Sequence, residues 1–181
     1  RIRGLRQADI AVLVRDMGEA HAIRTALARR GVRSVYLSDK DSVFAGAEAA
    51  DALSWLKACA EPDDDRKLRA ALASATLALP LAELDRINRD ERVWEEWVLR
   101  FRGYRDRWRG QGVLPMLRRL MDDFGLPGAL ARRTDGERIL TNLLHLAEIL
   151  QQAAGELDGE QALIRHLAGH LGQEGQTAEA Q

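Results

Sequence analysis

The spacing of hydrophobic positions changes along the chain. Residues 9–14 and 32–38 are short apolar runs rich in β-branched side chains, which predict strands. Residues 19–31, between them, place apolar side chains at helical spacing and close on Gly31, a common residue at helix C-termini. Strand, helix and strand in this order form a βαβ unit, so we expect a small α/β portion at the N-terminus.

From residue 46 onward the spacing is helical throughout. Proline, glycine and acidic residues divide this part into helical segments at 46–62, 66–79, 80–88, 93–110, 113–125, 127–133, 136–157 and 159–172. Residues 173–181 are polar and aperiodic, which predicts a disordered tail. The expected fold is therefore mainly α, with a partial βαβ unit followed by a multi-helix region. Two strands are too few for a stable parallel sheet, and the first residue is not methionine, so we expect a segment of a longer protein.

Large aromatic side chains recur every three or four residues in segment 93–110. On a helix they form a stripe about 80° wide, which consists of Trp94, Trp97, Phe101, Tyr104 and Trp108. Such a stripe is either a platform for the bases of single-stranded nucleic acid or the buried face of a helix. Burial is favoured, because five exposed rings in line would form a costly apolar patch. Arginines line both edges of the stripe, and the candidate DNA contacts on one edge are Arg102, Arg105 and Arg109.

The net charge is close to zero, with 27 Lys and Arg against 28 Asp and Glu. This excludes a strongly basic nucleic-acid binder and leaves only a local basic patch. The single cysteine, Cys59, cannot form a disulfide within the chain, and its apolar helical surroundings predict a buried side chain. A single cysteine fits a reducing, cytoplasmic setting, which is the location we expect. No apolar run approaches the roughly 20 residues that span a bilayer, so we expect no membrane segment.

Self-contained catalytic motifs are missing from the sequence, which has no GxxxxGK[ST], GxGxxG, CxxC or HExxH. His166 and His170, one helical turn apart, have the spacing of two zinc ligands. No carboxylate or cysteine is placed to complete that site, so a polar helix edge is favoured and no metal is expected. Arg15 directly follows the predicted strand 9–14, where a guanidinium can meet a phosphate. From the residues alone, a solvated surface arginine is the favoured interpretation.

Several separated segments resemble a known protein family. Residues 9–74 are similar to the start of the second RecA-like domain of UvrD/Rep-type superfamily-1 DNA helicases, with a strand, an arginine, a helix, a strand, a Phe-containing loop and then DALSWL. Within that group, four segments of this chain resemble the β subunits of exonuclease V (the RecB family). They are SVYLSDKDSVF, GYRDRWRGQGVLPMLRRLM, GERILTNLLHLAEILQQA and GEQALIRHL. The resemblance implies three parts: a partial RecA-like motor domain at 1–61, an inserted helical subdomain at 62–172 and the tail at 173–181.

The same resemblance implies a function for the parent protein. Its relatives are ATP-dependent DNA helicases and exonucleases that use ATP and Mg²⁺, act on double-strand ends and work with RecC and RecD subunits. Arg15 matches the family arginine that reaches the γ-phosphate of ATP, which reverses the interpretation from the residues alone. An arginine in that place neutralises charge on the transferred phosphoryl group.

Much of the family machinery has no counterpart in this sequence. The phosphate-loop lysine, the Mg²⁺-binding acid, the catalytic glutamate, the second arginine finger and the nuclease domain are absent. Residues 76–88 also lack the glycines of the hairpin that contacts duplex DNA in simpler relatives. We therefore expect a non-catalytic segment, without cofactors of its own, that positions DNA and partner subunits. The alternatives are a freestanding helical protein–protein adaptor and, third, a metal-dependent enzyme using His166 and His170.

Overall fold

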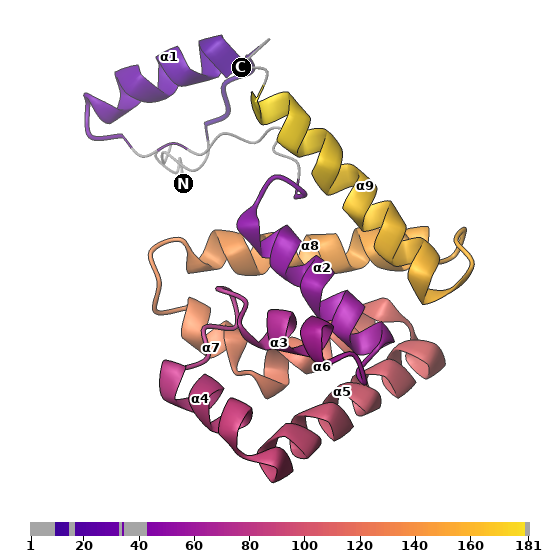
Figure 1. Cartoon of the computed structure of the whole chain (residues 1–181). Coiled ribbons are helices and arrows are strands. Elements are labelled where there is room, and N and C mark those ends of the chain that lie inside the picture. The colour runs from indigo at the N-terminus through magenta and orange to yellow at the C-terminus, as the bar shows by residue number, and fades with distance from the viewer. Residues whose placement is uncertain (1–9, 15–16, 33, 35–42, 180–181) are drawn as a thin grey trace, which may run out of the picture. The chain divides into compact units, whose positions relative to one another are not determined.

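The computed structural model describes residues 10–14, 17–32, 34 and 43–179. The chain divides into two compact units, Arg1–Asp41 and Ser42–Gln181. The described residues form the helices of Figure 1: α1 Met17–Ala28, α2 Ala47–Ala60, α3 Asp65–Leu72, α4 Leu81–Arg89, α5 Glu91–Gln111, α6 Val113–Asp123, α7 Leu126–Leu130, α8 Gly136–Ala153 and α9 Gly159–Glu179. None of the described residues lies in a strand. The prediction of a mainly helical protein is thus confirmed.

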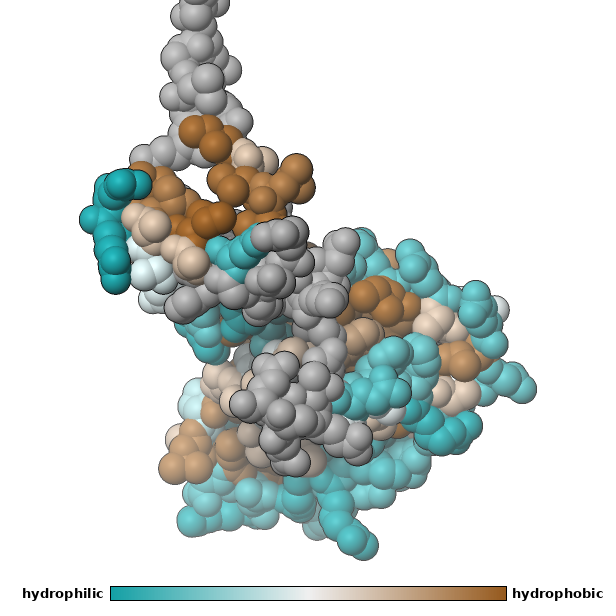
Figure 2. All heavy atoms as spheres, turned by 90° about the horizontal axis from the view of Figure 1, so that it is seen from above, coloured by the Kyte–Doolittle hydropathy of each residue, from teal (hydrophilic) through white to brown (hydrophobic). Residues whose placement is uncertain are grey.

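The N-terminal unit does not form the expected βαβ unit within its described residues. Helix α1 lies where a helix was expected. Residues 10–14, expected as the first strand, have no regular structure, and Leu13 is 100% exposed. Hydrophobic residues gather on the surface of this unit in Figure 2. Residues 35–38, most of the second expected strand, lie outside the described residues. A strand needs a neighbour to satisfy its backbone hydrogen bonds, and the described part of this unit supplies none.

Helix α2 lies at the centre of the larger unit and packs against α3, α5, α8 and α9. Its sequence is rich in alanine, and its buried positions are spread over more than one face of the helix. The fully buried side chains are Ala49, Ala52, Trp55, Leu56, Ala58 and Cys59. The predicted burial of Cys59 is confirmed, and burial raises the pKa of its thiol.

The other helices extend this core on both sides of α2. Helix α5 packs on α4 and α6, and α8 packs on α6, α7 and α9. Their largest fully buried side chains are Leu68, Leu72, Phe101, Met116, Leu120, Leu126, Leu130, Leu146, Leu150 and Leu163. Among the described helices, none is long and apolar enough to cross a membrane.

Aspartate side chains cap two of the helices. The Asp64 Oδ1 atom accepts hydrogen bonds from the backbone N–H groups of Arg66 (3.0 Å) and Lys67 (3.2 Å) at the start of α3. Asp90 caps α5 in the same way, by accepting from the N–H of Arg92 (3.0 Å). These bonds satisfy backbone donors that have no partner inside the helix.

The helix predicted over 66–79 ends earlier than expected, because side chains in its second half bind elsewhere. The indole Nε1 of Trp55 donates to Ser74 Oγ (2.9 Å) in the core. Thr76 donates from its backbone N–H (2.8 Å) and from its hydroxyl (2.6 Å) to Asp51 Oδ2. Such side-chain bonds compete with helix formation. Residues 73–80 consequently form a loop between α3 and α4.

The division at residues 61 and 172 stays a prediction. Helix α2, which the sequence assigns to the first part, packs within the larger unit. Helix α9 continues to Glu179, past the expected start of the tail.

Candidate functional site

Helix α5 directs its aromatic stripe into the core. The buried rings are Trp97, Phe101, Tyr104 and Trp108. Trp94 is half-buried, and the guanidinium of Arg69 lies 4.3 Å from its ring centroid. Trp97 also stacks on Phe124, directly after α6, with centroids 5.3 Å apart. The prediction of core packing is confirmed, and the buried rings are not available to stack on bases.

Tyr104 has a structural hydrogen bond at this face. Its hydroxyl donates to Asp123 Oδ2 (3.0 Å), and Arg119 Nε donates to the same oxygen (3.0 Å). Burial, followed by the charge of Asp123, raises the pKa of Tyr104. The phenol therefore stays protonated and joins α5 to α6.

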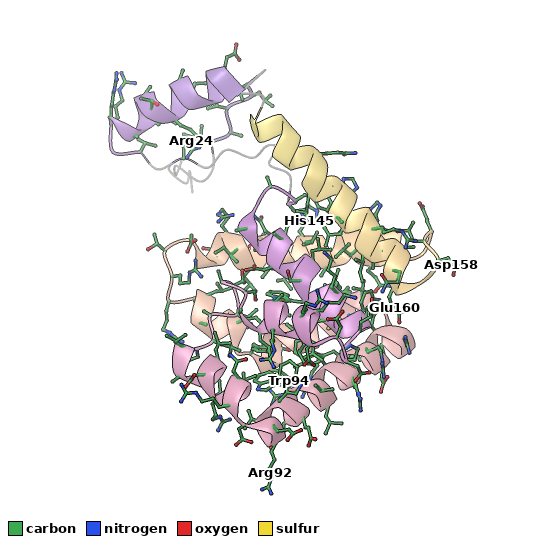
Figure 3. The ribbon with its side chains drawn as sticks, in the orientation of Figure 1. Arg24, Arg92, Trp94, His145, Asp158 and Glu160 are labelled. Atoms are coloured by element: carbon green, nitrogen blue, oxygen red, sulfur yellow. The ribbon has the colours of Figure 1, made fainter. Side chains whose placement is uncertain are left out.

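Two of the three predicted DNA-contact arginines are held by acids from other elements. Arg102 donates from Nε (3.0 Å) and from one terminal nitrogen (2.5 Å) to Asp63 Oδ1, before α3. Arg109 donates from Nε to Glu160 Oε1 (2.6 Å), at the start of α9 in Figure 3. That hydrogen bond, followed by the carboxylate charge, raises the pKa of Arg109. Both side chains stay exposed at their tips.

Arg105 lies between these two arginines and is less exposed. Its Nε is buried and has no hydrogen-bond partner among the described residues. The nearest carboxylate oxygen is that of Asp106, 3.6 Å from Nε, beyond hydrogen-bond distance. The Arg105 side chain is thus 25% exposed, and its inner nitrogen is buried. The structure therefore places all three predicted arginines along one helix.

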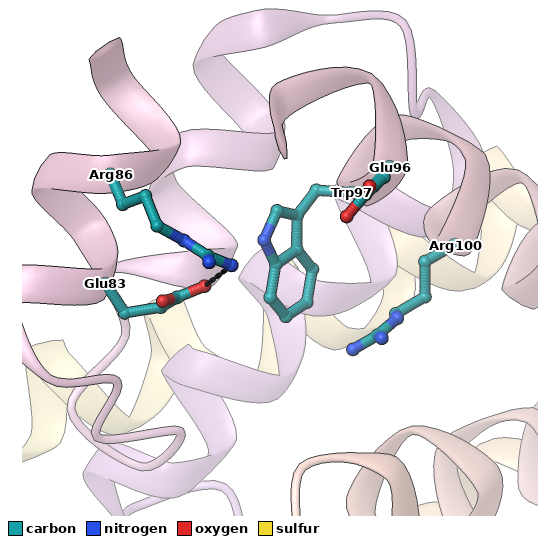
Figure 4. A pocket seen from close by; sticks show the side chains of 5 residues that line it. All are labelled: Glu83, Arg86, Glu96, Trp97 and Arg100. Atoms are coloured by element: carbon teal, nitrogen blue, oxygen red, sulfur yellow. Dashed lines mark hydrogen bonds and ion pairs between the residues drawn. The ribbon is translucent and has the colours of Figure 1, made fainter. Parts of the chain in front are cut away.

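The opposite edge of α5 borders a shallow hollow of about 230 Å³. Figure 4 shows its lining side chains: Glu83, Arg86, Glu96, Trp97 and Arg100. Glu83 and Arg86 form an ion pair (3.1 Å), and the Arg100 guanidinium lies 4.5 Å from the Trp97 ring centroid. Two acids and two bases leave the hollow without net charge, so it has no electrostatic preference for an anion.

The remaining predicted site residues are Arg15 and the two histidines of α9. Arg15 lies outside the described residues. His166 and His170 lie edge to face, with ring centroids 4.7 Å apart, and Phe44 stacks on His170 at 4.5 Å. Within the part of the chain that the structure describes, no group of three or more His, Cys, Asp or Glu residues is arranged to hold a metal ion.

One buried polar cluster was missed by the sequence reasoning. Glu48, in the first turn of α2, is only 4% exposed. Its Oε1 accepts hydrogen bonds from Arg138 (2.9 Å) and Asn142 (2.8 Å) of α8. A Cβ on Gly46 would overlap the carboxylate, so the glycine leaves room for it. No local signal identifies this cluster, because the partners are 90 and 94 residues away.

Comparison with known proteins yields one consistent result. No family model matches the chain. The RecBCD enzyme subunit RecB of Escherichia coli K12 is 43% identical over 169 residues, which is 93% of this chain and 14% of that protein. RecB of Haemophilus influenzae is 41% identical over 177 residues, covering 95% of this chain and 14% of the relative.

A more distant relative shows the same pattern. RecB of Mycobacterium tuberculosis is 34% identical over 155 residues, covering 81% of this chain and 13% of the relative. In each comparison the similarity extends over most of this chain but covers only a small part of the relative. The chain is therefore related in sequence to RecB subunits of RecBCD enzymes and spans about 14% of the length of the first of these curated relatives.

Proposed function

We propose that this chain is a non-catalytic, helical part of a RecB-type subunit of an ATP-dependent DNA helicase and exonuclease. In double-strand-break repair and recombination it positions DNA and the RecC and RecD subunits. The observation that carries the DNA role is the exposed edge of α5, where acids hold the guanidinium groups of Arg102 and Arg109 in place. The relationship to subunits named RecB supports the wider assignment.

A held arginine remains a phosphate ligand. Guanidinium has five N–H donors, and Asp63 accepts from two nitrogens of Arg102, while Glu160 accepts from one of Arg109. The remaining donors of these exposed side chains are open to a phosphate oxygen. Because each arginine is paired with a carboxylate, the attraction is partly cancelled, and we expect weak binding that is sensitive to salt.

The test is a fluorescence-anisotropy titration of duplex DNA at two salt concentrations. The variant is Arg102→Ala/Arg109→Ala, and the matched control is Arg118→Ala/Arg133→Ala, which also removes two exposed, acid-paired arginines. Loss of two phosphate contacts should reduce the slope of log affinity against log salt by about 2, with little change in the control. Equal slopes in both variants would exclude this edge as a DNA contact.

We also propose that Arg15 contacts the γ-phosphate of ATP in the complete motor, where Mg²⁺ accompanies the nucleotide. This role rests on the family resemblance of the segment around it. In the full subunit, Arg15→Ala should reduce ATP hydrolysis by about 10³-fold or more, as expected for an arginine finger. Its DNA affinity should stay within twofold of wild type. A parallel loss of DNA affinity would argue against a contact made in the transition state.

The alternative function is that of a freestanding helical protein–protein adaptor without motor activity. It is favoured by one observation, the exposed apolar residues between Ala78 and Ala82. An adaptor would show no salt-dependent DNA affinity in the titration above.

A further inference from the structure

The start of α4 exposes a run of apolar side chains. We call this run, with one following leucine, the α4 apolar surface; its residues are Ala78, Leu79, Pro80, Leu81, Ala82 and Leu84. Leu81 is 81% exposed, while Leu79 and Leu84 are half-buried. Helix α4 packs against α5, and its buried residue is Ile87. Consecutive exposed apolar residues are uncommon on a soluble surface unless they have a function.

A hollow of about 530 Å³ lies on this surface. Three apolar residues line one part of it, namely Leu81, Ala82 and Leu84, and the rest is Asp85, Asn88 and Arg89. The polar groups already have partners, since Arg89 Nε pairs with Asp85 (2.9 Å) and the Asn88 side-chain oxygen accepts from Arg69. An apolar centre beside satisfied polar groups resembles a protein–protein interface.

The loop before α4 holds these side chains in place. Ala78 has φ +50°, a left-handed conformation that residues other than glycine rarely adopt. Its N–H donates to the backbone oxygen of Ser74 (3.2 Å), and Ser74 is itself bound by the buried Trp55. The loop is therefore anchored to the core on the side before Leu81. Leu81 is presented to solvent by a fixed backbone and not by a free loop.

We propose that the α4 apolar surface binds an uncharged aliphatic segment of a partner subunit. The inference rests on the proposed function, in which the chain belongs to a multisubunit enzyme, and it names one docking surface. Nucleic acid does not fit this surface, because the one cation among the residues that line the hollow, Arg89, is paired with Asp85. Six residues are also far fewer than the roughly 20–30 residues per side of a stable interface. A second copy would therefore not be held by this surface alone, whereas a subunit attached elsewhere can add this contact.

The first test is photo-crosslinking in the assembled enzyme. p-Benzoylphenylalanine replaces Leu81 in the full-length subunit, and the matched control carries it in place of Leu99, an isolated exposed leucine of α5. The crosslinked peptide is identified by mass spectrometry. We expect a crosslink from position 81 to an uncharged aliphatic segment of a partner subunit, at least tenfold stronger than from position 99. Crosslinks to DNA, to a second copy or to the same polypeptide, or equal yields at both positions, would overturn the proposal.

A second measurement addresses the strength of the contact. Leu81→Glu places a charge in the hollow, whereas Leu99→Glu makes the same change away from it. The dissociation constant for the partner subunit should rise about tenfold for Leu81→Glu and less than twofold for Leu99→Glu. Equal changes would overturn the proposal. The DNA role is tested separately, by the slope of log DNA affinity against log salt concentration. If that slope behaves as expected but the docking contact is not found, only this further inference is overturned.

Discussion

The carboxylate of Glu48 accepts a hydrogen bond of 2.9 Å from the guanidinium of Arg138, across 90 residues of chain. Glu48 is buried at the start of α2, while the Arg138 side chain is largely exposed on α8. The pair thus joins the central helix to a helix formed much later in the sequence. A buried carboxylate depends on its donors, because burial without them is unfavourable.

Removing Arg138 should therefore destabilise the larger unit. In Arg138→Ala, Glu48 keeps the hydrogen bond from Asn142 but loses the charged donor, and we expect a loss of about 1–3 kcal/mol in the free energy of unfolding. Urea denaturation followed by circular dichroism measures it. The control Arg133→Ala breaks an exposed pair with Asp135 and should cost less than about 1 kcal/mol. Equal losses would mean that the buried pair adds no stability.

The aromatic stripe predicts a large effect for a single ring. Trp97→Ala removes a buried indole that contacts Phe124, and we expect a loss of about 3–5 kcal/mol in the free energy of unfolding. Leu99→Ala, two residues away on the exposed side of the same helix, should change it by less than about 0.5 kcal/mol. An unchanged melting temperature with lower affinity for single-stranded DNA would instead favour base stacking at Trp97.

Two glycines should respond oppositely to alanine. A Cβ on Gly136, the first residue of α8, would overlap the backbone carbonyl of Leu130, so Gly136→Ala should lower the melting temperature. Gly103, in the middle of α5, has open space around it, and Gly103→Ala should stabilise the protein by about 1 kcal/mol through helix propensity. Thermal unfolding of both variants checks the pair. An unchanged melting temperature of Gly136→Ala would show that the backbone between α7 and α8 can shift to make room for the added methyl group.

The helix cap at Asp64 should make a pH-dependent contribution. Hydrogen bonds from the backbone of Lys67, followed by weaker contacts with Lys67 and Arg66, lower the pKa of Asp64 below its usual 3.8. Because the folded-state pKa is depressed, the stabilisation is complete above pH 3.8 and is lost as pH falls through the lower folded-state value. The difference in unfolding free energy between wild type and Asp64→Ala should therefore shrink below pH 3.8.

A non-titrating cap provides the control for this effect. Asp64→Asn keeps a side-chain oxygen that can accept the same hydrogen bonds but has no proton to gain in this range. The difference in the free energy of unfolding between Asp64→Asn and Asp64→Ala should not depend on pH. If the stability advantage over Asp64→Ala fell equally with pH for wild type and for Asp64→Asn, the pH dependence would belong to other carboxylates of the protein.

The sequence predicts features that depend on neighbours along the chain. The stripe on α5 follows from spacing within a single helix, and its burial was found as expected. The pairs of Arg102 with Asp63 and Arg109 with Glu160 could not be predicted, because their partners lie 39 and 51 residues away. Such pairs depend on how the helices pack, which hydrophobic periodicity does not determine.

The errors have the same origin. Residues 10–14 have strand-like composition, but a strand forms only beside another strand. The helix over 66–79 was predicted from local propensity, yet Trp55 and Asp51 bind side chains of its second half and end it early. In both places tertiary contacts, or their absence, outweighed local preference.

The polypeptide joins the larger unit at its most buried helix. Val43 is buried, Phe44 stacks on His170 of α9, and Glu48 binds α8, all within a few residues of the start of α2. Tension applied to the chain before this point would therefore pull on three helices together and not unravel a peripheral one. Release of this first helix would thus disturb α8 and α9 as well, so the unit is expected to open cooperatively and not to fray from its N-terminal side.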